Sequence, residues 1–487
     1  MYIGIDLGTS GIKAVLTSTT GEIIAQATAG LECSHLHPLH SEQHPQDWVN
    51  ALHLVMADLQ QQQSLAQVRS IGLSGQMHGA VLLDVQGQVL RPAILWNDGR
   101  SFAECEELST HTTDALNITG NLIMPGFTAP KLLWVKTHEP DIFAQINKVL
   151  LPKDFLRYIL SGEYVTEMSD ASGTMWLDVT KRRWSKEMLA ATGLSEKHMP
   201  TLCEGSEVST QVTPELYTKW GLPANVNIAG GGGDNAAGAV GIGLVEPGQA
   251  MLSLGTSGVY FVVTDTYSSA PRKAVHSFCH ALPNTWHLMS VMLSAASCTD
   301  WLCKSIINTD INTMFEQLDQ RTDYTPSKLL FLPYLSGERT PHNDPDAKGV
   351  FIGLTQSTTY LDMFQAVLEG VTFAFKDGFD AIHEVAPEVD EINIIGGGAK
   401  SPYWRQLIAN VLQSPVVYRE GSEAGAALGA ARLAILADTD ASVSDVCAPP
   451  AELDRHTPDS ALNTQYQQKY ALYQQLYKQL YPIFKQL

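Results

Sequence analysis

The sequence predicts an α/β protein built from two related halves, each with a mixed sheet covered by helices on both faces. Residues 7–11 read Leu-Gly-Thr-Ser-Gly, and the same five residues recur at 254–258. Each copy lies between two strand-like stretches, so the similarity covers a whole hairpin. We interpret the repeat as an internal duplication. A chance match in a chain with 38 glycines is the alternative.

The first half begins with three strands, expected at residues 2–6, 13–17 and 23–27 and joined by tight turns. A helix should follow from Pro45, because proline suits the first helical turn. Its apolar residues recur at helical spacing at Trp48, Leu52, Val55, Met56 and Leu59. Further strands are expected at 68–73 and 80–84. Strands that alternate with helices in this way are typical of a mixed sheet with both faces covered.

The second half repeats this plan. Strands are expected at 250–254, 259–264 and 392–395, followed by a turn of three glycines at 396–398. A helix should come next, because Ser401 can cap it and Pro402 suits its first turn. We place the boundary between the halves near residues 243–248, where Glu-Pro-Gly interrupts the chain.

The last segment, 464–487, is predicted to be an amphipathic helix. Tyrosines recur at steps of three and four at Tyr466, Tyr470, Tyr473, Tyr477 and Tyr481. Such a stripe favours packing on the helix's own domain, and contact with another subunit is the alternative.

Composition excludes several classes of protein. Lys and Arg total 31 against 51 Asp and Glu, a net charge of 31 − 51 = −20, and no basic run is present, which argues against a nucleic-acid partner. No apolar run reaches the roughly 18 residues of a membrane span, and the N-terminus lacks the pattern of a signal peptide. The seven scattered cysteines form no CxxC pair, so we expect reduced thiols in a cytoplasmic protein without a zinc site.

The glycine-rich turns suggest phosphate binding. Turns of Gly, Ser and Thr between strands expose consecutive N–H groups that can surround phosphate oxygens without a cation. Two such turns from two halves could hold a polyphosphate between them, although either one taken alone is more simply a turn. The sequence has no Gly-Lys dipeptide, which excludes a Walker motif, and residues 230–238 lack the context of a dinucleotide-binding turn.

Two aspartates stand out. Asp6 ends the first strand beside the first turn, where a carboxylate is suited to ordering Mg²⁺ through its water shell. Asp234 follows four glycines and begins a helix of small residues, whose positive dipole end is expected to favour the ionised carboxylate. An ionised Asp can accept the proton of a substrate hydroxyl during phosphoryl transfer. The alternatives are that Asp6 caps its own turn and that Asp234 only caps its helix.

The motifs together resemble a known family. Residues 3–10, 252–258 and 395–399 are similar to the two phosphate motifs and the adenosine motif of the actin-like ATPase superfamily. Residues 126–138, with Lys131 and Trp134, and residues 349–369 resemble the two signatures of the FGGY carbohydrate kinases. The resemblance runs from Tyr2 to about Ala437. Within the family, the most similar members phosphorylate D-xylulose, as judged from residues 74–79, 95–100, 231–238 and 333–341.

This resemblance implies two ribonuclease-H-like domains of the actin-like ATPase type, with mixed central sheets flanked by helices and an active-site cleft between them. Residues 1–244 would bind the sugar and residues 245–487 would bind ATP. The implied activity is phosphorylation of D-xylulose at O5 by ATP with Mg²⁺, and a homodimer is compatible with the family. Alternatives are a kinase for another ketose or polyol, such as ribulose or fuculose, and a non-kinase actin-like ATPase.

The same resemblance implies roles for individual residues. Asp234 would be the general base, and Asp6 and Asp234 would lie beside Mg²⁺. The residues implied at the sugar are Met77, His78, Trp96, Asp234 and Asn235. The residues implied at the nucleotide are Gly8, Thr9, Ser10 and Lys13 in the first hairpin, Gly255, Thr256 and Ser257 in the second turn, and Gly397 and Gly398 near adenosine.

The pair Met77–His78 separates the alternatives. An imidazole offers one donor and one acceptor to neighbouring hydroxyls, and a thioether offers an apolar wall; core packing is the alternative for either side chain. A glycerol kinase would be expected to carry Arg-Glu here, and a chaperone or filament ATPase has no need of such a site. One loop departs from the resemblance, because it carries His35, His37, His40 and His44. We favour the interpretation that these histidines are solvated over the alternative that they bind a metal.

Overall fold

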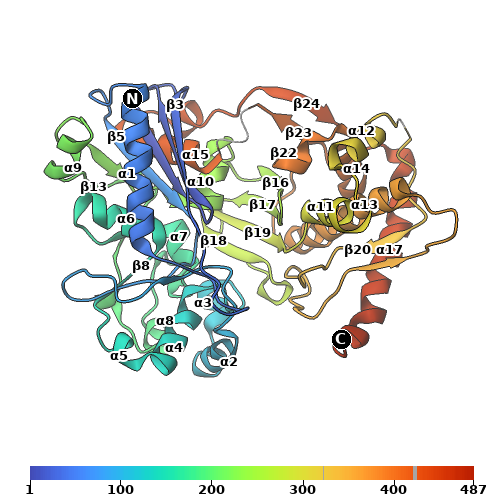
Figure 1. Ribbon diagram of the computed structural model, residues 1–487, viewed down its shortest axis with the longest axis horizontal. Helices are drawn as coiled ribbons and strands as arrows, with labels where there is room; N and C mark the ends of the chain where they lie inside the picture. The colour runs from blue at the N-terminus through green and yellow to red at the C-terminus, as the bar shows by residue number, and fades with distance from the viewer. Residues whose placement is uncertain (322, 421–424) are drawn as a thin grey trace.

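The computed structural model describes residues 1–321, 323–420 and 425–487. Two seven-stranded sheets form the cores of the two halves (Figure 1). The first has the order β13-β14-β5-β1-β2-β3, with β15 also paired to β5. Its strands are β1 (Tyr2–Leu7), β2 (Gly11–Thr17), β3 (Ile23–Gly30), β5 (Ser70–Gly75), β13 (Val208–Gln211), β14 (Asn227–Ala229) and β15 (Gly232–Gly233).

The second sheet has the order β18-β19-β17-β16-β22-β23-β24. Its strands are β16 (Ala250–Leu254), β17 (Gly258–Thr264), β18 (His276–Cys279), β19 (Trp286–Met292), β22 (Ile392–Ile395), β23 (Val416–Arg419) and β24 (Glu452–His456). In the first sheet, β1 is antiparallel to β2 and parallel to β5. In the second sheet, β16 is antiparallel to β17 and parallel to β22. This shared topology confirms the predicted pair of ribonuclease-H-like units and supports the internal duplication.

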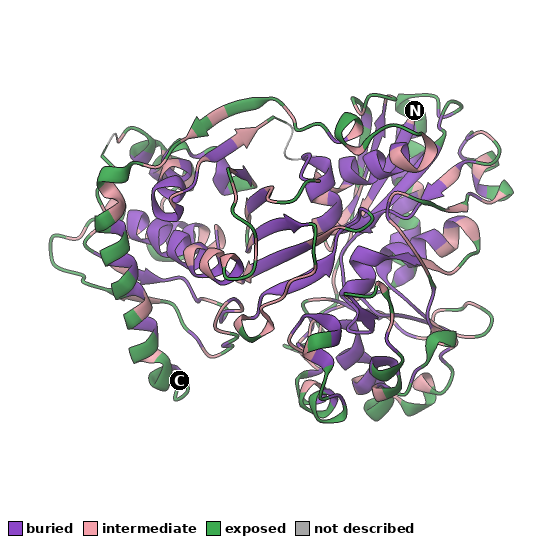
Figure 2. Cartoon of the chain, turned by 180° about the vertical axis from the view of Figure 1, so that it is seen from behind, coloured by how far each residue is buried: buried purple, intermediate pink, exposed green. Residues whose placement is uncertain are grey.

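Helices cover both sheets. In the first half they are α1 (Pro45–Gln62), α2 (Phe102–His111), α3 (Ala115–Thr119), α4 (Thr128–His138), α5 (Pro140–Phe143), α6 (Pro152–Ser161), α7 (Met168–Ser172), α8 (Lys186–Ala191), α9 (Pro214–Lys219) and α10 (Asp234–Gly241). In the second half they are α11 (Ser297–Trp301), α12 (Ile311–Asp319), α13 (Tyr360–His383), α14 (Pro402–Leu412), α15 (Gly425–Asp438), α16 (Val443–Val446) and α17 (Ser460–Phe484). The sheets and the helices between them are buried, and the outer helices keep exposed stripes (Figure 2).

Most predicted elements are confirmed, with small shifts at their ends. The Ser401 hydroxyl caps α14 by accepting from the Trp404 N–H, as expected. The strand expected at 80–84 is β6 (Val81–Leu83), but it pairs with β8 (Lys148–Leu150) outside the main sheet. The last helix begins earlier than predicted, because the Asp459 carboxylate caps it at the Ala461 N–H.

The tyrosine stripe of α17 faces its own domain. Tyr466, Tyr470, Tyr473 and Tyr477 are buried, and only Tyr481 is substantially exposed, at 44%. The Tyr473 hydroxyl lies 2.7 Å from the Tyr334 hydroxyl, so the stripe is anchored inside the domain. The structure therefore confirms the packing interpretation of this helix, and the homodimer stays a prediction.

Two helices cross between the halves. α10 and α15 lie side by side at the centre of the molecule (Figure 1), and α15 packs on β1 and β5 of the first sheet. The contact is close enough to require glycine: a Cβ on Gly429 would lie 1.7 Å from the Ala237 oxygen, and one on Gly72 would lie 1.8 Å from the Ala430 oxygen. A helix from late in the chain thus completes the packing of the first sheet.

Among the described residues, no helix combines the length and the apolar character needed to cross a bilayer. All seven cysteines are free thiols, in agreement with the sequence prediction.

Candidate active site

The carboxyl ends of three parallel strands bring the predicted first-half residues together. In the pairing of β1 with β5, Asp6 lies opposite Ser74, and in the pairing of β15 with β5, Gly233 lies opposite Gly75. Met77 and His78 follow β5 directly, and Asp234 follows β15. The carboxyl edge of such a sheet is where α/β proteins bind ligands.

The Asp6 carboxylate has one oxygen that is not satisfied by a hydrogen bond from the described part of the chain. Its Oδ1 atom is shielded from solvent and has no hydrogen-bond partner among the residues that the structure describes. Burial raises the pKa of Asp6 to about 6, against smaller opposing effects of Ser74 and of Lys13, its cross-strand neighbour. Burying a carboxylate oxygen without a hydrogen-bond donor costs free energy, so a bound cation would stabilise the oxygen there.

Asp234 is the first residue of α10, and Gly233 is the N-cap, so Asp234 is not the capping residue itself. Its Oδ1 accepts from the Asn235 N–H at 2.7 Å and from the Asn235 side-chain amide at 2.9 Å. Burial, followed by the charge of Asp6, raises the pKa of Asp234 to about 7. The expectation that the helix dipole would favour the ionised form is therefore wrong, because desolvation and a neighbouring carboxylate outweigh it.

The glycines before Asp234 allow the chain to pass very close to β5. Gly231 has φ of +77°, and a Cβ on it would lie 1.9 Å from the Leu73 oxygen of β5. Only glycine fits both the backbone conformation and the space. This close approach brings Asp234 to the end of β5.

Met77 lies directly beside this glycine run. The Met77 side chain is buried, and its Cγ would be 3.1 Å from a Cβ on Gly233. The thioether therefore forms a wall next to the residue that precedes Asp234. The structure thus brings Met77 to the predicted base.

His78 is held in an uncommon backbone conformation, with φ of +68°. The Lys131 ammonium group donates to the His78 carbonyl at 2.8 Å and to the Gly126 carbonyl at 2.7 Å. The imidazole Nδ1 lies 2.6 Å from the Gly173 carbonyl, and burial together with Lys131 lowers the pKa of His78 well below its ordinary value. Because a carbonyl only accepts, Nδ1 carries the proton and Nε2 is left as an acceptor.

Trp96 and Thr9 belong to one partly buried hydrogen-bond network. The Trp96 indole donates to the Thr9 hydroxyl at 2.9 Å, and that hydroxyl donates to the Gln76 side chain at 2.9 Å. Gln43 joins the network by accepting from Gln76 and donating to the Thr9 carbonyl at 2.7 Å. The Thr9 hydroxyl proton is therefore already committed. The first turn is itself closed by the Gly8 N–H, which donates to the Gly11 carbonyl.

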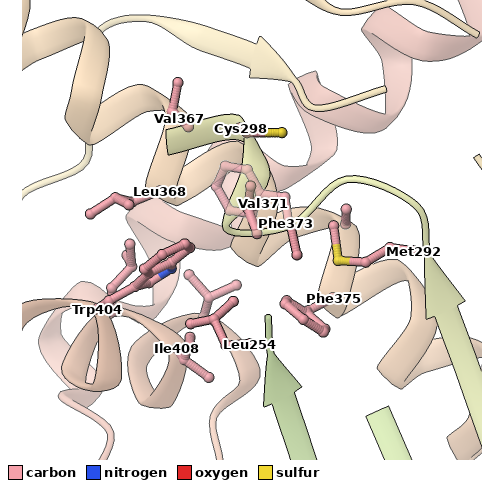
Figure 3. Packing of buried hydrophobic residues seen from close by; sticks show 14 of the residues in the cluster. Leu254, Met292, Cys298, Val367, Leu368, Val371, Phe373, Phe375, Trp404 and Ile408 are labelled. Atoms are coloured by element: carbon pink, nitrogen blue, oxygen red, sulfur yellow. The ribbon is translucent and has the colours of Figure 1, made fainter. Parts of the chain in front are cut away.

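The predicted nucleotide residues of the second half line a cavity of about 710 Å³. Gly255, Thr256, Gly397 and Gly398 are among its lining residues, together with Phe315, Lys400 and the acidic residues Asp300, Glu316 and Asp319. Leu254, just before the second turn, is anchored in the core against Trp404 and Ile408 (Figure 3). Of the described residues predicted here, Ser257 and the first-hairpin residues Gly8, Thr9, Ser10 and Lys13 do not line this cavity.

A second cavity, of about 490 Å³, lies between the halves. Trp96 and Gly126 line it from the first half, and Glu338 and Arg339 from the second. Burial raises the pKa of Glu338 to about 8. The Arg339 guanidinium makes no hydrogen bond or ion pair with any residue in the described ranges, and its Nη2 would be 3.7 Å from a Cβ on Gly126. No role for Arg339 could be predicted from the sequence, because nothing near Arg339 in the chain indicates which distant residues lie beside it.

The histidine loop is mostly exposed, as the favoured interpretation predicts. The rings of His37 and His40 lie 4.9 Å apart between centroids, and His35 Nδ1 contacts the His40 carbonyl. Within the described part of the chain, no group of three or more His, Cys, Asp or Glu side chains is arranged to hold a metal ion.

Comparison with known proteins identifies the family of this chain. Residues 1–241 match the N-terminal domain of the FGGY family of carbohydrate kinases, and residues 250–437 match its C-terminal domain. The chain is 53% identical to the xylulose kinase of Escherichia coli over 99% of this chain and 100% of the relative, and 51% identical to that of Klebsiella pneumoniae, with the same coverage. A crystal structure of a "xyloylose kinase" from Brucella ovis superposes with a TM-score of 0.95 at 47% identity, covering 99% of both chains. The chain belongs to the FGGY family of carbohydrate kinases, and it is a kinase with the two-domain actin-like ATPase fold.

Proposed function

We propose that this kinase transfers the γ-phosphate of ATP to O5 of D-xylulose. Full-length similarity to proteins named xylulose kinase supports the substrate. The observation that carries the proposal is the placement of the Met77 side chain against Gly233, directly before Asp234, with His78 next to Met77 in the chain. A thioether wall and a neutral imidazole with a free acceptor nitrogen suit a small polyhydroxy ketone.

Asp234 is proposed as the general base. In phosphoryl transfer through a loose transition state, the hydroxyl proton leaves late, so a carboxylate can accept it. A base whose pKa lies near the working pH is the most effective, and burial places the pKa of Asp234 near 7. The two hydrogen bonds from Asn235 fix one carboxylate oxygen and leave the other for the substrate hydroxyl.

Asp6 and Asp234 are the residues proposed to lie beside Mg²⁺. The unpartnered Oδ1 of Asp6 and the mutual repulsion of the two carboxylates fit a cation at this point. When bound, Mg²⁺ would neutralise charge that builds up on the transferring phosphate. Two carboxylates without a third ligand are compatible with Mg²⁺, which usually keeps several waters.

The 710 Å³ cavity is proposed to take adenosine, with Gly397 and Gly398 against it and the turn of Gly255, Thr256 and Ser257 toward the phosphates. The first turn, with Gly8, Thr9, Ser10 and Lys13, would face the phosphates from the other half. Because the Thr9 hydroxyl is committed, its main-chain N–H is the group proposed to contact phosphate. The proposed division is 1–244 for sugar binding and 245–487 for ATP binding.

A panel of sugars tests this function. Purified protein with ATP and Mg²⁺ should form ADP with D-xylulose, and much more slowly with D-ribulose, L-fuculose, D-ribose and glycerol. Phosphorus–proton coupling in the product should place the phosphate on C5. Preference for another ketose would overturn the substrate assignment and leave the kinase assignment intact.

A further inference from the structure

A buried arginine donates hydrogen bonds to main-chain carbonyls at the start of the glycine run that leads to Asp234. Arg157 lies on α6 and is fully buried. Its Nη1 donates to the Ala229 carbonyl at 2.6 Å, and its Nη2 donates to the Gly230 carbonyl at 2.5 Å. Nη1 also donates to the Ser209 hydroxyl, which in turn donates to the Ile228 carbonyl at 2.8 Å. Three consecutive carbonyls are thus tied to one guanidinium group.

The other end of the glycine run is held from the same side. The Gly233 N–H donates to the Ser169 hydroxyl at 3.0 Å. Ser169 lies in the short helix α7, which Glu167 caps by accepting from the Ser169 and Asp170 N–H groups. Residues 230–233 are therefore fixed at both ends, and Asp234 follows directly. Glycines lose the most conformational freedom on ordering, so such a run needs external constraint to hold one geometry.

A cluster of buried charges keeps Arg157 in place. Lys153 lies 2.7 Å from Asp154, 3.4 Å from Glu167 and 3.1 Å from Asp170, and all of these side chains are fully buried. Arg157 Nε lies 4.0 Å from Asp154. Lys153 also packs beneath Gly75, at the end of β5, where its Cβ would be 3.3 Å from an added Cβ. The cluster therefore lies directly behind the site edge.

We propose that Arg157 is a positioning residue for Asp234, acting through the carbonyls of Ala229 and Gly230. The inference rests on the proposed function, in which Asp234 is the base. A planar guanidinium group donates two parallel hydrogen bonds to neighbouring carbonyls, whereas an ammonium group is a single point of charge. A small displacement of a base costs far more in turnover than in binding, because the near-attack geometry is lost.

Arg157→Lys keeps the positive charge but removes the paired N–H donors of the guanidinium group, so it is the central variant. Its kcat should fall by about 10–100-fold while the KM for sugar and the Kd for ATP stay within about twofold of wild type. Amide hydrogen exchange of residues 231–235 should speed up, with α1 unchanged. The matched control is Arg91→Lys, another buried arginine of the first half that donates to a carbonyl, that of Pro92, and to Glu42. Arg91→Lys should keep wild-type kcat.

The outcomes separate the inference from the proposed function. Wild-type protein that phosphorylates no sugar defeats the proposed function before any variant is measured. If wild type is active and Arg157→Lys keeps kcat within about threefold, the positioning role is wrong. The role is equally wrong if kcat, KM and melting temperature all change together, because that pattern indicates general destabilisation. Arg157→Lys is chosen over Arg157→Ala, which would leave several buried groups without partners.

Discussion

The Trp96 indole donates a hydrogen bond to the Thr9 hydroxyl at 2.9 Å, and so joins the first glycine turn to a wall of the cavity between the halves. The turn carries the N–H groups proposed to contact phosphate, and Trp96 is proposed to contact the sugar. One partly buried hydroxyl would therefore couple the geometry of the two proposed substrate sites. The same hydroxyl donates to Gln76, next to Met77.

Thr9→Val should separate these parts. Valine has nearly the shape of threonine but leaves the Trp96 indole N–H without its acceptor and the Gln76 Oε1 atom without its donor, which should lower the free energy of unfolding by about 1–3 kcal/mol. The KM values for both ATP and sugar should rise. Urea unfolding and steady-state kinetics measure the two effects. Thr9→Ser keeps the hydroxyl and should behave nearly as wild type; an equal loss in Thr9→Ser would contradict the hydrogen-bond explanation.

Asp234→Asn should remove transfer and keep nucleotide binding. An amide cannot accept the hydroxyl proton in the transition state, so kcat should fall by about 10²–10⁴-fold. The Kd for ATP, measured by calorimetry, should stay within about threefold of wild type, because the 710 Å³ cavity is built from the second half. Asp47→Asn, a change at an exposed carboxylate on α1, is the control and should have no effect. A variant that keeps most of its turnover would remove Asp234 from the mechanism.

Asp234→Asn should also stabilise the metal-free protein, and increasingly so as the pH rises. The pKa of Asp234 is raised to about 7 in the folded state, against about 3.9 in an unfolded chain. The stability that this group contributes is therefore complete below about pH 4 and is lost as the pH rises through 7.

Urea unfolding of wild type and Asp234→Asn at about pH 5 and about pH 8, without Mg²⁺, measures this trend. The stability advantage of the variant should be larger at the higher pH. An advantage that shrinks with pH would mean that the carboxylate is ionised in the folded protein without cost.

ATP binding should depend on divalent metal more than on ionic strength. The protein has a net charge of −20, and the cavity proposed for the nucleotide is lined by Asp300, Glu316 and Asp319. Phosphates would therefore be held by oriented N–H groups and by the metal rather than by a field of positive charge. Calorimetry with chelator should show a loss of affinity of at least about tenfold, and a rise in salt at constant Mg²⁺ should change the Kd by less than about threefold. The reverse pattern would point to cationic side chains.

The crossing of α10 and α15 predicts a contrast between two glycines. Gly429→Ala would place a Cβ 1.7 Å from the Ala237 oxygen, so the helices must separate and the melting temperature should fall sharply. Gly238→Ala, on α10 itself, meets nothing within 4 Å and should raise the melting temperature slightly, because alanine favours a helix. Thermal unfolding compares the two. Similar melting temperatures would mean that the helices can move apart freely.

The sequence predicted the architecture well because glycine turns, alternation and capping residues act locally. The repeated turn, Ser401 and Pro402 each report on a neighbouring backbone, and the structure agrees with them. Asp6 and Asp234 could be singled out because each stands beside glycines at a strand end.

What could not be predicted is set by contacts between distant segments. Lys153, Asp154 and Arg157 resemble a solvated helix face in the sequence, yet all three are fully buried. The pKa of Asp234 was also beyond local reasoning, because it depends on burial and on Asp6, which lies more than two hundred residues away in the chain. Arg339 belongs to the same class, since its cavity is built from both halves.

The position of α15 also bears on how the protein is made. β1 and β5 leave the ribosome within the first 75 residues, but the helix that covers them, α15, is Gly425–Asp438. During translation, one apolar face of the first sheet therefore stays uncovered by α15 until almost the whole chain has been synthesised. The first half cannot be expected to mature alone, so a message truncated before α15 should give an aggregation-prone product, and chaperone demand should persist until α15 emerges.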